Sequence, residues 1–386
     1  MGGCIAGDLR RCPGFFVIWA AVPALAASAY YLLAIIGALR WRRTSLKTSG
    51  PRQPVSILKP MYGSSPRLYE ALLSHALVDY PEFEILFGIR DASDPALKAI
   101  APLQREFPTV RIRVISVTAE APNPKAFVLA QLAKEARYPV LVINDDDILV
   151  ECSYLQSVAG PLSDPKVGLL TCLYRSRAHS WPTLAEALGI ATEFAPSVLV
   201  AHQLGMAGFA LGATMALRAE TLRAIGGFEP ISAYLADDYQ LGRKVAQAGL
   251  RVELAPAIVE TDLGDSSWAE TWRHQLRWAR TVRVSRPGGY YGSILTHATL
   301  WAIVAFALRQ WWAGGLALGL RLIAGWIVGA VILRDRQVVR WFWLMPLRDL
   351  FGLAVWLGGC FGSTVYWRGR KLRLEPDGRI AHSSTN

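Results

Sequence analysis

Cysteine and histidine are scarce in this sequence, and neither is clustered. The five cysteines (Cys4, Cys12, Cys152, Cys172 and Cys360) are odd in number and far apart, and none forms a CxxC pair. The six histidines show no HExxH spacing. Disulfide frameworks and zinc sites depend on such pairs. The sequence therefore predicts neither, and a reduced, cytosolic environment is expected.

Charged residues are also few, at 18% of the 386 residues, against 52% hydrophobic residues. The net charge is +11, but no basic stripe with interleaved aromatic residues occurs in the polar part of the chain, so nucleic-acid binding is not expected. The basic residues lie instead beside apolar stretches, as for contact with anionic lipid headgroups. Together with 14 tryptophans, this pattern indicates a chain partly dissolved in a lipid bilayer.

The first apolar stretch, residues 12–40, predicts a transmembrane anchor. It carries no charged side chain before Arg40 and is long enough for one helix to cross a bilayer. Basic residues follow at once, so the positive-inside rule predicts that the next segment is cytoplasmic. A cleaved signal peptide is the alternative, because AlaAlaSerAla at 26–29 resembles a cleavage site, but the stretch is too long for one. The initial MetGlyGlyCys lacks the Ser or Thr at position 6 that myristoylation favours.

A second apolar region covers residues 291–366. Its three pieces are 292–308, 311–333 and 341–366. Basic residues follow the second and third pieces, which predicts cytoplasmic connectors, a hairpin made by the first two pieces, and a cytoplasmic basic tail at 367–386. The third piece is expected to re-enter the membrane or lie at its interface, because Arg348 and Asp349 need protein or water around them, as does Arg321 in the second piece. Three plain crossings with an external tail are the alternative.

Between these regions, residues 53–265 are expected to form a soluble α/β domain. The predicted strands are 55–60, 83–90, 111–116 and 140–143, and the predicted helices are 68–77, 95–106 and 125–136. This alternation indicates a mainly parallel sheet with right-handed crossovers. Ligands bind such sheets at the carboxyl ends of their strands.

Carboxylates follow two of the predicted strands. Asp145, Asp146 and Asp147 come directly after the strand at 140–143, and Asp91 follows the strand at 83–90. Like charges this close raise one another's pKa, and Mg²⁺ or Mn²⁺, which prefer oxygen ligands, would relieve the repulsion. The sequence therefore predicts one metal-dependent site at this edge. An acidic turn that faces solvent or caps a helix is the alternative.

Three later features belong to the same hypothesis. Lys125, in a rigid AsnProLys loop, is able to reach a diphosphate as a point charge, unless it is a solvent-exposed turn lysine. Residues 208–218 predict a strand whose small residues allow close approach of a ligand. Asp237 and Asp238 begin a predicted helix, where one of them is either a general base for an acceptor hydroxyl or a carboxylate stabilised by the helix dipole.

Residues 266–290 are expected to form an interfacial segment around an amphipathic helix at 267–283. This helix is rich in Trp and Arg, as is typical of helices that lie in the membrane interface. Arg277 and Trp278 could also face the catalytic edge, where Arg277 would counter phosphate charge and Trp278 would form a pocket wall.

The order of these motifs resembles that of a known enzyme group. Asp91, Asp145-x-Asp147, Asp238 and HisGlnLeuArgTrp at 274–278 resemble the D, DxD, D and (Q/R)xxRW series of glycosyltransferase families 2 and 21. The segments 91–95, 123–125 and 367–373 are similar to those of ceramide glucosyltransferases and of the bacterial relatives that glycosylate hopanoids. His274 departs from the Gln or Arg that opens the last motif.

The resemblance implies a GT-A fold, a nucleotide-sugar donor of the UDP-hexose type, and Mn²⁺ or Mg²⁺ as cofactor. Asp91 would bind the uridine part, and Asp145 and Asp147 would hold the metal on the diphosphate. Asp238 would remove the proton from the acceptor hydroxyl in a single displacement that inverts the anomeric carbon.

It also implies roles for residues around this centre. Arg277 and Trp278 would steady the departing UDP, while Lys125, Asp237 and His274 are further candidates for substrate binding. The site would face the cytoplasm from a membrane of the bacterial inner-membrane type. The sequence does not predict an oligomeric state.

The acceptor is expected to be a membrane lipid. Residues 192–197 lack the HisPro pair of animal ceramide enzymes, and the HisxxArgTrp ending resembles the hopanoid-type relatives, which favours a hopanoid polyol with UDP-N-acetylglucosamine as donor. Ceramide with UDP-glucose is the alternative. A processive polysaccharide synthase, which would need a transmembrane channel, and an inactive lipid-binding scaffold are further alternatives.

Overall fold

The computed structural model describes residues 13–44, 52–63, 65, 67–117 and 121–381, with the side chains of the first helix described for residues 21–43. The initial MetGlyGlyCys, Cys4 and Cys12 lie outside these residues. The other three cysteines, Cys152, Cys172 and Cys360, are free thiols.

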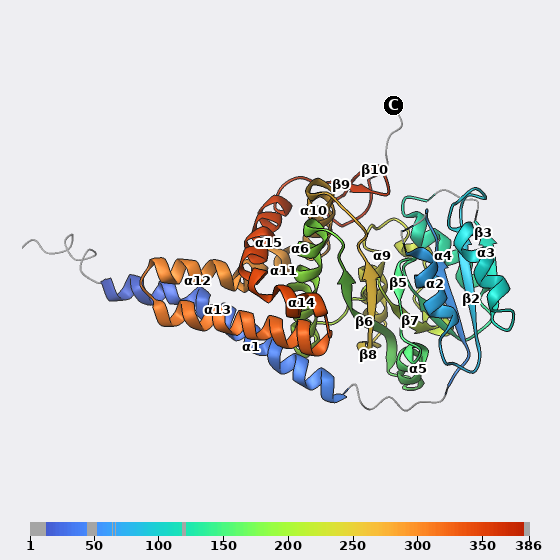
Figure 1. Ribbon diagram of the computed structural model, residues 1–386, viewed down its shortest axis with the longest axis horizontal. Coiled ribbons are helices and arrows are strands. Elements are labelled where there is room, and N and C mark those ends of the chain that lie inside the picture. The colour runs from blue at the N-terminus through green and yellow to red at the C-terminus, as the bar shows by residue number, and fades with distance from the viewer. Residues whose placement is uncertain (1–12, 45–51, 64, 66, 118–120, 382–386) are drawn as a thin grey trace, which may run out of the picture.

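An eight-stranded mixed sheet forms the centre of the polar part of the chain (Figure 1). Its strands are β1 (Val55–Pro60), β2 (Phe83–Ile89), β3 (Arg111–Ser116), β4 (Val140–Ile143), β5 (Ile148–Leu149), β6 (Val167–Arg177), β7 (Met215–Arg218) and β8 (Arg251–Asp262). They lie in the order β3-β2-β1-β4-β7-β6-β8-β5. The first four strands are mutually parallel, as predicted, and β7 joins them to the parallel pair β6–β8 by antiparallel pairing on both sides.

One predicted strand is much shorter than expected. Of residues 208–218, only Met215–Arg218 form a strand, whereas the preceding residues form a loop closed by a bridge between Leu211 and Thr214. Gly208 and Gly212 have no side chain to pack against a neighbouring strand, so this part of the chain gains little from pairing.

Helices cover both faces of the sheet. They are α2 (Leu68–Ala76), α3 (Leu97–Glu106), α4 (Pro124–Glu135), α5 (Tyr154–Ala159), α8 (Ala219–Ala224) and α9 (Asp237–Gln247). In β1, Val55 and Ile57 point into a core shared with α2, α3 and α5, while Leu58 points into a core shared with α4 and α9. This alternation follows from the two-residue period of a strand. Because helices cover the two faces, the ends of the strands form the open edge of the domain.

The remaining helices form an apolar assembly on one side of the sheet (Figure 1). They are α1 (Pro13–Thr44), α6 (Trp181–Gly189), α7 (Ala195–Gln203), α10 (Trp268–Ser285), α11 (Pro287–Gly292), α12 (Ala298–Ala307), α13 (Trp311–Gly325), α14 (Arg336–Trp341) and α15 (Met345–Gly359). The helices α1, α12 and α13 lie side by side and extend away from the sheet. Alanines fill most of their mutual contacts, which lets the backbones approach closely.

Three helical stretches are long and apolar enough to cross a membrane: Ala21–Arg43, Trp181–Gln203 and Trp311–Ile332. The first and third correspond to the predicted anchor and to the second C-terminal piece. In each of these two stretches, only 39% of the most apolar 18-residue segment is buried inside the protein. In the stretch from α6 to α7, 72% of the corresponding segment is buried. The outward apolar surface of α1 and α13 suits lipid, and the α6–α7 helix is an internal element between the sheet and α1.

The first piece of the predicted hairpin forms the short helix α12. Its 10 residues span roughly 15 Å, about half of a bilayer's hydrocarbon core. It is followed by α13 after a turn that includes Arg309 and Gln310, where the turn was expected. The crossing of α12 stays a prediction.

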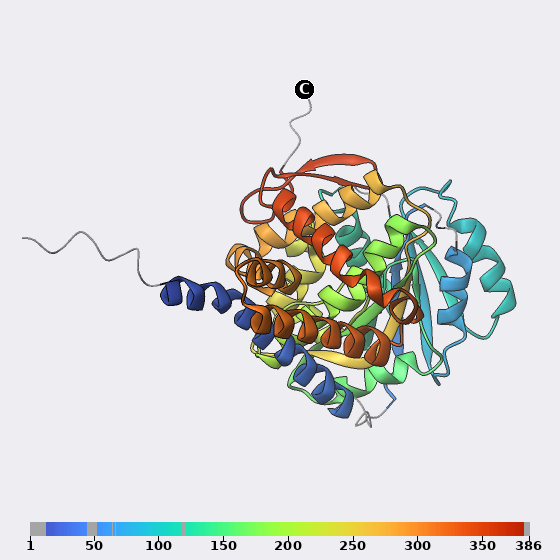
Figure 2. The same ribbon diagram turned by 60° about the vertical axis from the view of Figure 1, so that its left-hand side comes forward.

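The predicted basic tail begins with ordered structure. Strands β9 (Thr364–Trp367) and β10 (Arg370–Arg373) form a two-stranded hairpin, which lies against α10 in both views (Figures 1 and 2). The described part of the tail, up to residue 381, is therefore packed on the domain.

The charges within the apolar pieces are paired inside the protein. Arg321, which is 1% exposed, binds Asp349 through an Nη2–Oδ1 contact of 2.6 Å and donates a hydrogen bond of 2.8 Å to the carbonyl oxygen of Thr192. The Arg348 guanidinium lies 3.0 Å from the Glu193 carboxylate. These contacts attach α13 and α15 to the α6–α7 helix.

Replacing Asp349 by alanine would leave the Arg321 guanidinium buried without its counter-ion. We expect Asp349→Ala to lower the free energy of unfolding by about 3–5 kcal/mol, because an unpaired buried charge is strongly unfavourable. Thermal unfolding in detergent micelles, followed by tryptophan fluorescence, measures the loss. The double variant Arg321→Met/Asp349→Leu should recover most of it, and a single variant as stable as the wild type would contradict the role of the ion pair.

Candidate active site

The carboxyl ends of β1, β2 and β4 bring the predicted carboxylates to one edge of the sheet. Asp91 follows β2, and the triplet 145–147 follows β4. Since β1 lies between these two strands, β2 and β4 are about 10 Å apart across the sheet. Asp91 is exposed, and it accepts hydrogen bonds from the backbone N–H and the hydroxyl of Ser93, which lower its pKa. It shares the edge but contacts none of the other predicted site residues.

Lys125 is a buried partner of the acidic triplet. Its Nζ lies 2.7 Å from Asp145 Oδ1 and 3.6 Å from Asp237 Oδ2, and the residue is 8% exposed. Burial opposes its charge, but the surrounding carboxylates, Asp145 first, raise the pKa of Lys125 above its ordinary value. The alternative of a solvent-exposed turn lysine is therefore wrong.

The AsnProLys loop fixes this lysine against the segment before α9. The Asn123 side chain caps α4 by accepting hydrogen bonds from the N–H groups of Lys125 and Ala126. Its amide donates to the carbonyl oxygen of Tyr234 at 2.7 Å. The loop is therefore joined to the segment that leads into α9.

Asp237 and Asp238 occupy the first two positions of α9, behind Ala236 as the N-cap residue. Asp237 is buried, whereas Asp238 is partly exposed. The Asp238 carboxylate accepts hydrogen bonds from the N–H of Tyr239 at 2.7 Å and from the N–H of Gly212 at 2.9 Å. The helix N-terminus thus stabilises Asp238, but its carboxylate also reaches the loop beside β7, which a simple helix cap would not do.

Gly212 marks the point where the site residues converge. A side-chain carbon at this position would lie 3.2 Å from Asp238 Oδ2, 3.4 Å from Asp145 Oδ2 and 3.5 Å from Lys125 Nζ. Three residues from a span of more than 100 positions, Lys125 to Asp238, therefore lie around one glycine. The sequence prediction that small residues here permit close approach is consistent with this geometry, although the segment is a loop.

Asp146 and Asp147 are held where their negative charges are unfavourable. Burial, together with the neighbouring carboxylates, raises the pKa of Asp147 to about 7 and also raises that of Asp146. Thr261 of β8 donates a hydrogen bond to Asp147. Lys59 at the end of β1 donates to the main-chain oxygen of Asp145 at 3.0 Å, and burial lowers the pKa of Lys59 to about 8 although the triplet opposes this change.

This donor set fits a cation that is completed by substrate. Within the described residues, no group of three His, Cys, Asp or Glu side chains is arranged to hold a metal ion. Mg²⁺ is commonly held by one or two carboxylates, and substrate phosphates complete its coordination. Asp145 and Asp147 supply two such carboxylates, with charge that a cation would relieve.

The amphipathic helix α10 brings the last predicted motif next to an internal glutamate. His274 Nδ1 lies 2.6 Å from Oε1 of Glu186, which is 3% exposed. The Trp278 ring centroid lies 4.7 Å from that of His274 and 6.5 Å from that of Phe194. The motif is thus attached to the α6–α7 helix.

Arg277 faces the acidic edge. Burial lowers its pKa, and Glu186, Asp145 and Asp238 oppose this change, which places the guanidinium within electrostatic reach of all three carboxylates. Arg277 therefore interacts electrostatically with carboxylates of the triplet and of α9.

Sequence reasoning missed Lys59 and Glu186. Lys59 was treated as part of a strand, and only its position at the carboxyl end of β1 pointed to the site. Glu186 lies in an apolar stretch far from the other motifs, and no spacing in the sequence indicated its contact with α10.

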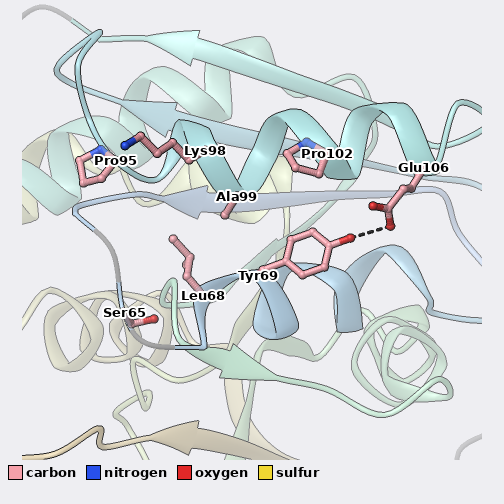
Figure 3. Close-up of a pocket in the computed structure, with 8 residues that line it drawn as sticks. All are labelled: Ser65, Leu68, Tyr69, Pro95, Lys98, Ala99, Pro102 and Glu106. Carbon is pink, nitrogen blue, oxygen red and sulfur yellow. Dashed lines mark hydrogen bonds between the residues drawn. The ribbon is translucent and has the colours of Figure 1, made fainter.

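A shallow groove between α2 and α3 lies outside this site (Figure 3). Its volume is about 680 Å³. The Tyr69 hydroxyl and the Glu106 carboxylate close one end of it, 2.5 Å apart, and Pro95 and Lys98 line the other end. No carboxylate of the triplet lines it.

Comparison with known proteins identifies the family. The sequence profile of Glycosyl transferase family 21 matches residues 17–380, nearly the whole chain. The protein belongs to glycosyl transferase family 21. It is a glycosyltransferase, and the resemblance inferred from its motifs is confirmed.

Relatives of this family 21 protein support the assignment. Ceramide glucosyltransferase 1 of Caenorhabditis elegans is 22% identical over 349 residues, which cover 86% of this chain and 74% of that protein. The probable glycosyltransferase YdaM of Bacillus subtilis (strain 168) is 22% identical over 231 residues, which cover 58% of this chain and 54% of that protein.

A solved structure confirms the fold. The mannosyltransferase PcManGT from Pyrobaculum calidifontis, solved in complex with GDP-Man and Mn²⁺, superposes with a TM-score of 0.52 at 19% identity. The match covers 89% of this chain and 99% of that one. The predicted GT-A-type α/β fold is therefore confirmed.

A side chain at position 212 should block the centre of the site. We expect Gly212→Val to reduce transferase activity by about 10²-fold, the scale of loss when reacting groups are displaced by an ångström. Activity and thermal stability are measured side by side, with Gly208→Ala as the control, because its new methyl group would meet only the Ala246 side chain. Full activity of Gly212→Val would show that the convergence point is not part of the site.

Proposed function

We propose that this protein transfers a hexose from a UDP-sugar to the hydroxyl group of a membrane lipid, with inversion at the anomeric carbon. The observation that carries the proposal is the convergence of Asp238, Asp145 and Lys125 around Gly212. This convergence lies at the ligand-binding edge of the sheet, beside a helical assembly that has lipid-compatible surfaces.

Asp238 is the proposed general base. Burial and the neighbouring Asp237 carboxylate raise the pKa of Asp238 to about 6 despite the nearby Lys125 ammonium. Such a value suits a base that operates near neutral pH. Asp238 accepts the proton of the acceptor hydroxyl, the acceptor oxygen bonds to the anomeric carbon, and the bond from that carbon to the diphosphate oxygen breaks. UDP leaves with the electron pair.

Cationic side chains steady the leaving diphosphate. Arg277 approaches from α10, with Trp278 as the pocket wall, and Lys125 is held beside the triplet. Asp145 and Asp147 would hold Mn²⁺ or Mg²⁺, which neutralises charge on the leaving group when bound. The presence of Mn²⁺ with a nucleotide sugar in PcManGT supports this assignment. Asp91, farther along the edge, is assigned to the uridine part.

The apolar helices support the proposed membrane placement. Helices α1 and α13 anchor the protein in a bilayer of the bacterial inner-membrane type, and the basic residues after α1 orient the catalytic domain toward the cytoplasm. The Trp-rich α10 lies at the interface, so a lipid hydroxyl is able to approach Asp238 from the membrane.

Two donor–acceptor pairs are proposed. The HisxxArgTrp motif and the segment 192–197 favour a hopanoid polyol with UDP-N-acetylglucosamine. The match with ceramide glucosyltransferase 1 supports ceramide with UDP-glucose as the second candidate to a comparable degree.

The decisive experiment uses purified protein, Mn²⁺, radiolabelled UDP-glucose or UDP-N-acetylglucosamine, and vesicles that contain ceramide or a hopanoid polyol. We expect label in one organic-extractable lipid, a loss of about 10²–10⁴-fold in Asp238→Asn, and no transfer in EDTA. A water-soluble polymer would indicate a polysaccharide synthase, and no turnover with any donor would indicate a lipid-binding scaffold. Undiminished transfer in chelator would contradict the metal assignment.

The pH profile tests the role of Asp238 separately. A general base acts in its deprotonated form, so activity should be constant above about pH 6 and fall about tenfold per pH unit below it. The residual activity of Asp238→Asn should lack this acidic limb. A wild-type profile that is flat from pH 5 to pH 8 would exclude Asp238 as the titrating base.

A further inference from the structure

The hairpin β9–β10 presents an arginine at its tip in an unfavourable backbone conformation. Trp367 pairs with Arg370, which leaves Arg368 and Gly369 as a two-residue turn. Their φ angles are 50° and 74°, so both lie in the left-handed region. Asn and Gly are the residues that such turns favour, and an arginine in the first position is strained. The turn alone therefore does not account for Arg368.

The hairpin is rigidly attached to the helix that carries Arg277. Arg280 donates a hydrogen bond of 3.0 Å to the carbonyl oxygen of Phe361, and Arg283 donates to the carbonyl oxygens of Cys360 and Gly362. These bonds fix the chain between α15 and β9 on the surface of α10.

The same hairpin contacts the segment that leads to the proposed base. Leu235 is buried in a cluster with Val365 of β9 and with Leu374 and Ile380 beyond β10. The Ile380 N–H donates to the carbonyl oxygen of Ala233 at 2.8 Å. The hairpin therefore links α10 to the residues just before Asp237 and Asp238.

The tip of the hairpin reaches the acidic edge. The Arg368 guanidinium carbon lies 4.5 Å from the ring centroid of Tyr62, which follows β1 by two residues, and 5.2 Å from that of Trp367. No carboxylate of the described residues lies within 4.0 Å of Arg368. Two aromatic rings thus contact a guanidinium that has no ionic partner in the described part of the chain.

The Arg368 charge influences the pKa values of two site residues, Asp146 and Arg277. Burial and Asp145 raise the pKa of Asp146, and Arg368 opposes that rise. Burial is the main reason that the pKa of Arg277 is lowered, and Arg368 adds to that effect. Arg368 is consequently within electrostatic reach of both the triplet after β4 and the guanidinium from α10.

We propose that Arg368 is a further substrate-binding residue, whose guanidinium donates hydrogen bonds to the phosphate oxygens of the nucleotide-diphosphate donor. The inference rests on the proposed transferase function. A planar guanidinium is suited to paired hydrogen bonds with phosphate. Arg368 on the β9–β10 hairpin and Arg277 on α10 flank the diphosphate. Arg280 and Arg283 hold these two elements together. The Tyr62 ring keeps the Arg368 side chain at the acidic edge.

Arg368→Asn separates substrate binding from turn structure. Asn tolerates the left-handed conformation better than Arg, so a purely structural role predicts equal or higher thermal stability and unchanged ligand affinity. We expect stability to be retained and UDP affinity to fall roughly 10- to 100-fold, the effect of losing a hydrogen bond to a charged group. Affinity for uridine should be unchanged, because uridine carries no phosphate.

The measurement is equilibrium displacement of a radiolabelled UDP-sugar from the full-length protein in detergent micelles with Mn²⁺, by UDP and by uridine. Arg370→Ala, on the same hairpin, is the matched control and should bind both as the wild type does. If Arg368→Asn binds UDP as tightly as the wild type, or loses UDP and uridine affinity equally, the proposal is overturned while the transferase function stands. A wild-type protein that binds no UDP would overturn both.

Discussion

Repulsion between carboxylates that the fold gathers at one edge of the sheet is the constraint on which the site depends. Asp145, Asp146 and Asp147 follow one strand, and Asp237 and Asp238 reach the same place from α9. Their mutual repulsion is strong because the edge is partly shielded from water. The protein offsets it with buried ammonium groups from Lys59 and Lys125. The surplus negative charge favours a cation, and the Arg277 guanidinium nearby favours a phosphate.

An internal helix holds this edge in a fixed relation to the apolar helices. The α6–α7 helix lies between the sheet and α1, and it receives charged contacts from both sides. On the membrane side, Thr192 and Glu193 bind the arginines of α13 and α15. On the catalytic side, Glu186 binds His274 of α10. One internal helix therefore connects the apolar helices α1, α13 and α15 to the helix that carries Arg277.

Much of the sheet was predictable because its strands are short segments rich in aliphatic residues that end at turn residues or charges. The strands from 55 to 143 and the start of α9 were found within two residues, and the placement of Asp91 and the triplet at strand ends followed from parallel topology. The loop at 208–214 was predicted as part of a strand with small residues, whereas Gly208 and Gly212 favour a turn. The α6–α7 helix was missed because Glu186 and Glu193 interrupt its apolar pattern, and only the folded protein supplies their partners.

The amino-acid sequence by itself determined the family, the α/β class, the apolar stretches at either end and the acidic residues at the strand ends, because these follow from local periodicity, charge and motif order. Tertiary structure alone decided that Lys125 is buried against Asp145, that Asp238 reaches Gly212, that Glu186 holds the motif on α10, and that the basic tail returns as a hairpin with Arg368 beside Tyr62. Each of these contacts joins residues from segments distant in sequence. Their burial and charge pairing arise only when the strands and helices pack together.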